Sequence, residues 1–283
     1  MPTLSSRPTL SSRPSSPSGF LVPVHNNPER WARFLEDHAP GLTWLASTLL
    51  EWAELPPGAR RAWLVTAQAT RAGEVEALAA LHESSGLLAI AAKPGTPPPL
   101  FGEADRVRRI IGSPANVEAM LDSVPVLMLR RGPGVRRLVF AFDGEVAPKR
   151  HPALRRAEPG SEAALDALRK VATEGGEGVL EADLAGGVQQ GALWSVQRAG
   201  GPVAMFRVEA VARRRIQVVD VCVHPDERGR GLGTALLQSA AAIARAEYAR
   251  GCVLTAPASE AAERTAARAG FTPAGMLEDV AFA

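Results

Sequence analysis

The 283-residue sequence contains two cysteines, one tyrosine and no run of 18 apolar residues. The lack of such a run argues against a helix that spans a membrane. Cys222 and Cys252 both lie inside apolar, strand-like stretches. We therefore interpret them as small buried side chains in a reducing environment, in preference to a disulfide or a metal site.

No excess of one charge is present either, because 32 Lys and Arg face 30 Asp and Glu, for a formal net charge of +2. This balance argues against a dedicated nucleic-acid surface. The hydrophobic content of 46% is enough for a sizeable core. We expect a soluble globular protein of one large or two modest domains, with no nucleic-acid or membrane partner. The oligomeric state is left open.

The first residues repeat PTLSSR and are rich in Ser, Pro and Arg. Such a segment buries too little apolar area to offset the entropy of ordering it, so we predict that residues 1–19 are a disordered tail. Its basic, acid-free composition is shared by organelle transit peptides, but it lacks their amphipathic periodicity, and no apolar segment typical of a secretory signal is found. We predict a cytoplasmic protein.

Residues 20–150 are predicted to form the first domain. Asn27-Pro28 favours a helix start, and a second helix follows through residues 42–50. Apolar runs at residues 61–67, 75–81 and 87–92 predict an antiparallel meander. Beyond it we expect helices around residues 103–111 and 116–123, then strands at residues 124–131 and 136–142. A polar, proline-broken stretch near residues 147–153 predicts a domain boundary.

Residues 151–283 are predicted to form the second domain. A helix begins near residue 161, and three apolar runs over residues 191–223 predict another meander. A helix over residues 234–250, a strand at 252–257, a helix at 259–269 and a strand from Gly270 complete it. This domain is therefore expected to contain both strands and helices along its whole length.

Residues 221–234 read VCVHPDERGRGLGT, with glycines placed between a strand and a helix. Such a loop favours phosphate binding, because the first backbone N–H groups of a helix lack internal partners. A Rossmann fingerprint fits poorly, since four residues separate the strand from the glycine-arginine segment. A P-loop also fits poorly, because Gly233 rather than lysine precedes Thr234.

The loop resembles the acyl-CoA pyrophosphate loop of the GNAT superfamily of N-acetyltransferases. The pattern V-x-P-x-x-R-G-x-G-x-G is matched by Val223, Pro225, Arg228, Gly229, Gly231 and Gly233. The resemblance covers roughly residues 153–283, where the predicted order of elements is also that of the family. It implies an α/β class with a mixed α+β sheet and a GNAT acyl-CoA N-acyltransferase fold in the C-terminal half.

This resemblance implies acetyl-CoA as the co-substrate. In the family the fourth strand ends in a bulge and splays from the fifth, so that its free backbone groups pair with the pantetheine arm. The residues that the resemblance places against the co-substrate are Val221, Cys222, Val223, Arg228, Gly229, Arg230, Gly231, Leu232, Gly233, Thr234 and Ser259. Cys222 is expected to pack there, not to react.

Two positions depart from the family. Many members carry an Asn after the fifth strand and a Tyr four residues before the glycine of the Gly-Phe pair, and the Tyr protonates the leaving thiolate. Ser259 and Ala266 stand at these positions here. Tyr248 is expected at the far end of its helix, so Ser259, water or no acid at all would serve. A thiolate is already a fair leaving group near neutral pH.

The identity of the general base that deprotonates the amine is also left open. Gln217 stands where some family members have a glutamate. Asp220 resembles the acidic residue of a D-L-x-V motif in diamine-type members, so it is our candidate for the base or amine anchor, with a buried structural carboxylate as the alternative. Glu209 and His224 are further candidates.

The N-terminal half lacks the arginine-glycine pattern between residues 97 and 105. We interpret it as a smaller, degenerate GNAT-like domain that forms one wall of the acceptor site, as in tandem GNAT proteins, or as another α/β domain. The predicted activity is transfer of an acetyl group from acetyl-CoA to a small-molecule or peptide amine. The alternative is a non-catalytic acyl-CoA-binding regulator, which the missing Tyr and Asn favour.

Overall fold

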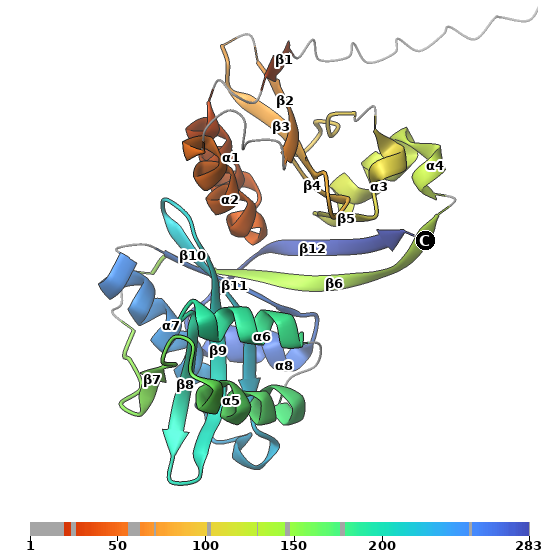
Figure 1. Ribbon diagram of the computed structural model, residues 1–283. Coiled ribbons are helices and arrows are strands. Elements are labelled where there is room, and N and C mark those ends of the chain that lie inside the picture. The colour runs from red at the N-terminus through yellow and green to blue at the C-terminus, as the bar shows by residue number, and fades with distance from the viewer. Residues whose placement is uncertain are drawn as a thin grey trace, which may run out of the picture.

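The computed structural model describes residues 20–23, 27–55, 63–70, 72–100, 103–128, 130–144, 148–175, 179–248 and 251–282, with the side chains of 20–23 left aside. The predicted disordered tail, residues 1–19, lies outside these described residues. Two lobes are visible in Figure 1, and two long strands run side by side between them.

The first half of the chain contains four α-helices, two short 3₁₀ helices and six strands within its described residues. In order, these elements are β1 (Phe20–Pro23), α1 (Pro28–His38), η2 (Pro40–Leu42), α2 (Thr43–Glu54), β2 (Trp63–Ala69), β3 (Val75–His82), β4 (Leu87–Ala92), η4 (Ala104–Arg106), β5 (Arg109–Gly112), α3 (Pro114–Ser123), α4 (Pro125–Met128) and β6 (Arg131–Phe142). The predicted start of the first helix is confirmed, since the Asn27 side chain accepts a hydrogen bond from the Arg30 amide at 3.2 Å. The β2-β3-β4 meander is confirmed as well.

Two predictions for this half are wrong. The expected helix over residues 103–111 is a short 3₁₀ turn followed by β5, because Ile110 and Ile111 are buried on opposite faces of the sheet. The expected strand over residues 124–131 is the helical turn α4. Pro125 starts it, and proline suits the first helical position while it removes a strand donor.

The second half follows the predicted order closely. Its elements are β7 (Leu154–Arg156), α5 (Glu162–Gly175), α6 (Glu181–Gln189), β8 (Leu193–Arg198), β9 (Gly201–Val211), β10 (Arg215–Val223), η5 (Pro225–Glu227), α7 (Leu232–Tyr248), β11 (Gly251–Pro257), α8 (Glu260–Arg268) and β12 (Thr272–Phe282). Among its α-helices, only α6 was not expected. Gly186 and Gly187 lower its helix propensity, yet a Cβ at Gly187 would lie 2.9 Å from the Arg207 side chain, so the glycine permits close packing.

All twelve described strands join in one sheet with the order β1-β2-β3-β4-β5-β12-β6-β11-β10-β9-β8-β7. The pairs β4–β5 and β10–β11 are parallel, and the other neighbouring pairs are antiparallel. Each half therefore contributes four antiparallel strands, β1 to β4 or β7 to β10, followed by a fifth strand that pairs in parallel with the fourth. This repeat favours the interpretation of the first half as a GNAT-like copy.

The two halves exchange their last strands. β6 belongs to the first half but pairs with β11, and β12 belongs to the second half but pairs with β5. β6 and β12 also pair with each other at the centre (Figure 1). The chain passes between the halves near the predicted boundary at residues 150 and 151, but strand pairing crosses it in both directions.

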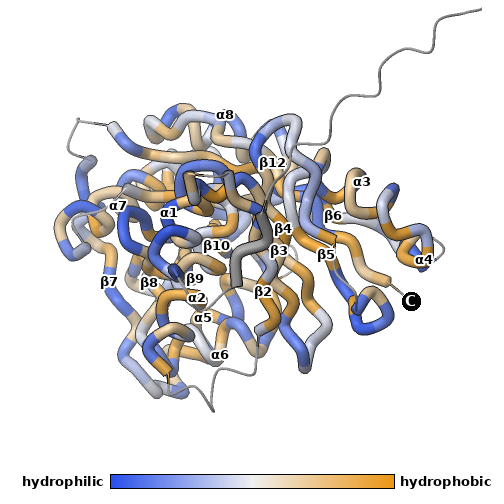
Figure 2. Tube along the Cα trace, turned by 90° about the horizontal axis from the view of Figure 1, so that it is seen from above, coloured by the Kyte–Doolittle hydropathy of each residue, from blue (hydrophilic) through white to orange (hydrophobic). Residues whose placement is uncertain are grey.

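Helices cover both faces of this sheet. Helices α1 and α2 pack on strands of both halves, and α5 and α6 continue the same layer over β9 and β10. Helices α3 and α4 cover the opposite face of the first half, and α7 and α8 that of the second. Figure 2 shows apolar residues concentrated along β3, β4 and β5, as expected for strands buried between two layers.

Gln217, on β10 of the second half, forms hydrogen bonds to the first half. Its side chain is 2% exposed, its Oε1 accepts from the Trp44 amide at 2.9 Å, and its Nε2 donates to the Gly41 carbonyl at 3.2 Å. Gly41 must be small, because a Cβ there would lie 2.7 Å from a Val139 methyl group. The position that holds a glutamate in some GNAT enzymes therefore holds a structural amide in this chain.

We expect Gln217→Leu to lower the free energy of unfolding by about 1–3 kcal/mol, because the Trp44 amide and the Gly41 carbonyl would be buried without partners. Urea unfolding measures this change. Gln189→Leu, at the exposed end of α6, is the matched control and should change stability by less than about 0.5 kcal/mol. Equal stability of the two variants would contradict the role of Gln217.

Candidate acyl-CoA and acceptor site

Strands β10 and β11 separate halfway along β10. Their parallel pairing runs from Arg215 to Val218 on β10, and the last pair joins Val218 to Leu254. Residues 219–223 continue as a strand that pairs with β9 alone. The predicted bulge and splay of this strand are confirmed, and one backbone edge of Val221, Cys222 and Val223 faces the opening between β10 and β11.

Two β-bulges lie beside the splay. On β9 the register shifts at Glu209, and on β10 it shifts between Val219 and Cys222. Asp220, within the second bulge, has φ of 55° and is the one non-glycine residue with positive φ in the described part of the chain. Aspartate tolerates this conformation better than most residues do. Bulges of this kind re-aim side chains next to active sites.

The glycine loop leads directly into α7. Gly229 and Gly231 have φ of 75° and 79°, and a Cβ at either would meet no atom within 4 Å. The 17-residue α7 begins at Leu232, so the first amides of a long helix point into this open loop. The cradle therefore fits a pyrophosphate group, which needs close backbone approach and free N–H donors.

The arginines of the loop are partly engaged. Arg228 donates to the Val223 carbonyl at 3.2 Å and to the Gly175 carbonyl at 3.1 Å. Arg230 pairs with Glu227 at 3.1 Å. Arg228 thus braces the loop against the end of α5, while its charge still contributes to the potential at the helix start.

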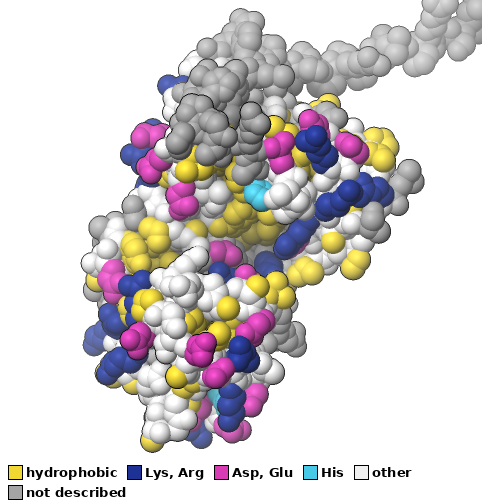
Figure 3. Space-filling view, in the orientation of Figure 1, with side chains coloured by type: hydrophobic (Ala, Val, Ile, Leu, Met, Phe, Trp, Pro, Cys, Tyr) yellow, Lys and Arg dark blue, Asp and Glu magenta, His cyan; other side chains and the backbone are white. Residues whose placement is uncertain are grey.

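A cavity of about 330 Å³ opens between the two lobes, beside the bulges. Figure 3 shows the hollowed region between the lobes, in which acidic and basic side chains lie beside apolar ones. The lining comes from both halves and comprises Gly41, Trp44, Leu87, Arg109, Ile111, Arg137, Leu180, Asp183, Arg207, Glu209, Gln217, Val219, Asp220, Thr255, Leu277 and Asp279. A cavity of this size suits a small molecule or a single extended side chain.

Arg207 is the centre of the charge cluster in this cavity. Its Nε donates to Asp220 Oδ2 at 2.7 Å, and its outer nitrogen lies 3.8 Å from Glu209 and 3.9 Å from Asp183. The Arg207 side chain is only 13% exposed. Three carboxylates therefore converge on one buried guanidinium, which leaves an excess of negative charge on this side of the cavity.

Burial raises the pKa of Glu209, and the nearby Asp220 and Asp183 add to that rise, while Arg207 and Arg137 oppose it. A glutamate with a raised pKa is a better proton acceptor near neutral pH than an ordinary one. Sequence reasoning named Glu209 only as a further candidate. The signal that singles it out is the β9 bulge beside Asp220, which no spacing rule reveals.

Cys222 and His224 have structural partners. The Cys222 side chain is 2% exposed among residues of α5 and α6, and burial raises the pKa of its thiol to about 12. His224 Nδ1 accepts from the Asp226 amide at 3.3 Å, and its Nε2 lies 2.5 Å from Glu174. Neither side chain is among those that line the cavity between the lobes.

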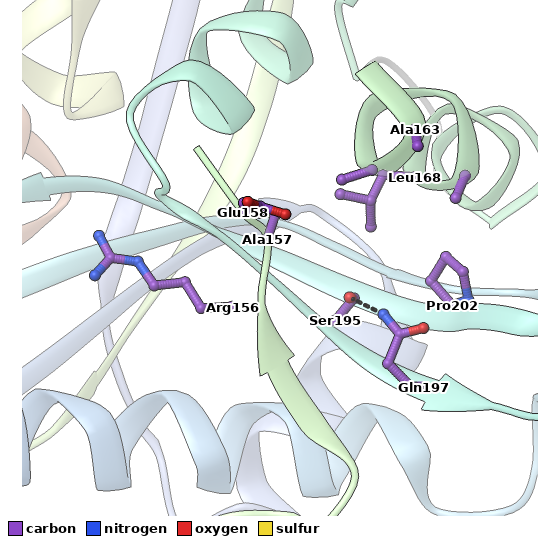
Figure 4. Close-up of a pocket in the computed structure, with 10 residues that line it drawn as sticks. Arg156, Ala157, Glu158, Ala163, Leu168, Ser195, Gln197 and Pro202 are labelled. Carbon is purple, nitrogen blue, oxygen red and sulfur yellow. Dashed lines mark hydrogen bonds between the residues drawn. The ribbon is translucent and has the colours of Figure 1, made fainter. Parts of the chain in front are cut away.

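A second cavity, of about 300 Å³, lies between α5 and strands β7 to β9 (Figure 4). Ser195 and Gln197 line it and bond to each other at 2.8 Å. Arg156 points away from it and donates to the Gly191 carbonyl. The side chains of Ser195 and Gln197 therefore already bond to each other, and we assign no function to this cavity.

The described residues contain neither a cluster of metal-ligating side chains nor a membrane-spanning helix. No group of three or more His, Cys, Asp or Glu side chains could hold a metal ion there. No helix within those residues is long and apolar enough to cross a membrane.

Residues 163–271 match the model of the acetyltransferase (GNAT) family. The chain carries a C-terminal GNAT domain. The matched segment contains the glycine loop, the splayed strand and both bulges.

Similarity in fold extends over both halves of the chain. A GCN5-related N-acetyltransferase from Sphaerobacter thermophilus is 15% identical, with a TM-score of 0.54 over 93% of this chain and 94% of that one. A Drosophila protein is 13% identical, with a TM-score of 0.58 over 94% and 98% of the two chains. Identities this low show the fold alone. No curated protein matched the sequence.

The departures from the GNAT pattern are visible in the structure of the domain. Ser259 caps α8, where its hydroxyl oxygen accepts from the Ala262 amide at 3.2 Å. Ala266, where many family members have tyrosine, is fully buried. Tyr248 ends α7, about 24 Å along the helix from the glycine loop. It is thus far from the splay between β10 and β11.

Proposed function

We propose that this chain transfers an acetyl group from acetyl-CoA to the amine of a small-molecule or peptide acceptor. The observation that carries the proposal is that β10 connects two features, because its end leads into the first and its bulge at Val219 and Asp220 lines the second. One is the open glycine loop at the start of α7, and the other is the charged cavity between the lobes. A cytoplasmic location remains a prediction from the sequence.

The co-substrate would lie along residues 221–234. Ser259, which follows β11, would contact it from the other side of the opening between β10 and β11. The backbone edge of Val221, Cys222 and Val223 that β11 leaves open would bond the pantetheine arm. The glycines and the first amides of α7 would hold the pyrophosphate. This arrangement would direct the thioester towards the β10 bulge, where Asp220 enters the acceptor cavity.

The reaction needs a neutral amine. The amine nitrogen attacks the thioester carbonyl carbon, the C–S bond breaks, CoA leaves as a thiolate, and the amine loses a proton. An alkylamine with a pKa of about 10.4 must first be deprotonated, at a cost of roughly 4–5 kcal/mol at pH 7. We assign the proton to Glu209, directly or through one water, because Glu209 lines the cavity beside Asp220 at the β9 bulge and the pKa of its carboxyl group is raised.

Asp220 suits the role of amine anchor better than that of base. Its Oδ2 already accepts a hydrogen bond from Arg207, which leaves Oδ1 for the ammonium group of an arriving acceptor. We expect Asp220→Asn to lower kcat/KM by about 10-fold to 100-fold through a higher KM for the amine. Asparagine also tolerates positive φ, so the fold should be preserved.

Steady-state kinetics separates the two constants for Asp220→Asn, and calorimetry checks that acetyl-CoA affinity stays within a few-fold. Asp122→Asn is the control, because Asp122 is exposed on α3, outside both the cavity and the glycine loop. An unchanged KM in Asp220→Asn would remove the anchor role.

The test of the proposal is release of CoA thiol from acetyl-CoA with a panel of amines, together with calorimetry of acetyl-CoA binding. We expect one co-substrate per chain. In the first half, the described residues between β4 and β5 form only the three-residue turn η4, so they offer no long helix start to a second pyrophosphate.

A non-catalytic acyl-CoA-binding protein is the second candidate. It is favoured by Ala266 and Ser259, which leave the domain without the acid of many relatives. Binding of acetyl-CoA without thiol release across the amine panel would favour this candidate. Catalysis without a dedicated acid remains chemically feasible, because the pKa of a free thiol is about 8.5.

A further inference from the structure

Two of the three arginines in the acceptor cavity already have carboxylate partners. Arg109 Nε donates to Asp279 Oδ1 at 2.6 Å, and a second bond joins the other side of the same carboxylate. Arg207 is held by Asp220 and lies near Asp183 and Glu209. Neither guanidinium is free to bind a new anion without breaking these pairs.

The third arginine, Arg137, has no such partner. It lines the cavity and is partly buried, yet within the described part of the chain its side chain forms no hydrogen bond or ion pair. Arg137 lies on β6, the strand that the first half contributes, opposite Pro257 and Leu277. Its charge reaches Glu209, where it opposes the rise in pKa.

The cavity is therefore polarised. The three carboxylates around Arg207, which attract a cation, lie on α6, β9 and β10. Arg137, which attracts an anion, lies on β6, which β11 separates from β10. A partly buried arginine is costly unless an anion pairs with it, and its planar fork fits a carboxylate with two parallel hydrogen bonds. A polyamine would be repelled at this end, and a neutral acceptor would leave Arg137 unpaired.

We propose that the acceptor is a small amino acid, meaning a molecule that carries a carboxylate as well as the amine. The carboxylate binds Arg137, and the ammonium group binds between Asp220 and Glu209. This inference rests on the proposed function for the identity of the reacting group, but the carboxylate site itself can be tested by binding alone.

The experiment compares common amino acids with the carboxamide of each, which removes the negative charge and keeps the amine. Calorimetry measures binding to the full chain, with and without CoA, and thiol release measures turnover. We expect at least one amino acid to bind about 10-fold to 100-fold more tightly than its amide, the scale for a hydrogen-bonded charge. Arg137→Gln should abolish that preference, and Arg137→Lys should retain part of it.

Arg136→Gln is the matched control. Arg136 is the neighbouring residue on β6, its side chain is 60% exposed, and it lies 4.0 Å from Glu278, outside the cavity. The preference for the acid should survive in this variant. Circular dichroism and thermal unfolding verify that each variant is folded.

Three results would overturn the inference: amides that bind as tightly as their acids, a preference that persists in Arg137→Gln, or acetyl-CoA binding with no amino acid bound. Failure of the proposed function is a separate result. A chain that prefers acids over amides but binds no acetyl-CoA would support the carboxylate site and contradict the transferase.

Discussion

A Gly231→Glu variant is expected to lose measurable binding of acetyl-CoA. Gly231 has φ of 79°, which a residue with a side chain adopts only with strain, and the new carboxylate would lie at the proposed pyrophosphate site. No atom lies within 4 Å of a Cβ at this position, so the substitution should not disturb the packing of the fold. Loss of micromolar binding would remove about 8 kcal/mol of binding free energy.

Calorimetry of acetyl-CoA binding measures this loss, and thermal unfolding checks the fold. Gly95→Glu is the matched control, because Gly95 has φ of 81°, a Cβ there would also meet no atom within 4 Å, and the residue follows β4 in the other half. Both variants add one charge and one strained residue. If they bound acetyl-CoA equally well, the assignment of the loop would be wrong.

The open glycine loop between β10 and α7 could be predicted from sequence because its conformation depends on local chemistry. Arg228, Gly229 and Gly231 lie within four residues of one another, and both glycines adopt positive φ. The meander and the helix after the loop follow from the same continuous segment, whereas the splay of β10 was implied by the resemblance to the GNAT family. Patterns of this range are what periodicity and turn chemistry encode.

The strand exchange could not be predicted in this way. The run that becomes β6 is recognisable as a strand, but nothing in its alternation indicates that it pairs with β11 in preference to a strand of its own half. Which strand pairs with β6 depends on how the helices and strands of both halves pack in the complete fold. For the same reason β5, whose partners are β4 and β12, was predicted as a helix.

The acceptor cavity depends on this exchange. Arg137 reaches it on β6, Trp44 reaches it on α2, and Arg207 reaches it on β9, at positions far apart in the sequence. Asp220 could be singled out from a local motif. Glu209 gains its role from a bulge in its own strand and from the charges around it, and both depend on the complete fold.

Glu209→Gln is expected to reduce turnover by about 100-fold or more while acetyl-CoA affinity stays within a few-fold, the usual scale for loss of a positioned base. In the wild type the rate should fall as pH drops through the pKa of Glu209. Because burial raises this pKa, the fall should begin above the ordinary glutamate range near 4.3. The fall assigned to Glu209 should be missing in the variant, and the remaining rate should follow deprotonation of the amine.

Stability should change in the opposite direction to activity. A carboxyl group whose pKa is higher in the folded protein than in the unfolded chain stabilises the fold only at low pH, and this contribution is lost as pH rises through the folded pKa. Glutamine avoids the loss, so Glu209→Gln should be at least as stable as the wild type at pH 8, with the difference shrinking towards pH 4. Urea unfolding at the two pH values measures this.

Glu76→Gln is the control, because Glu76 lies on β3 outside the cavity. It should alter neither turnover nor its pH dependence. A Glu209→Gln variant with low activity and reduced stability at pH 8 would indicate that Glu209 holds the cavity together. A variant with wild-type turnover and an unchanged pH profile would show that another group accepts the proton, and Asp220 would then be the remaining carboxylate at the bulge.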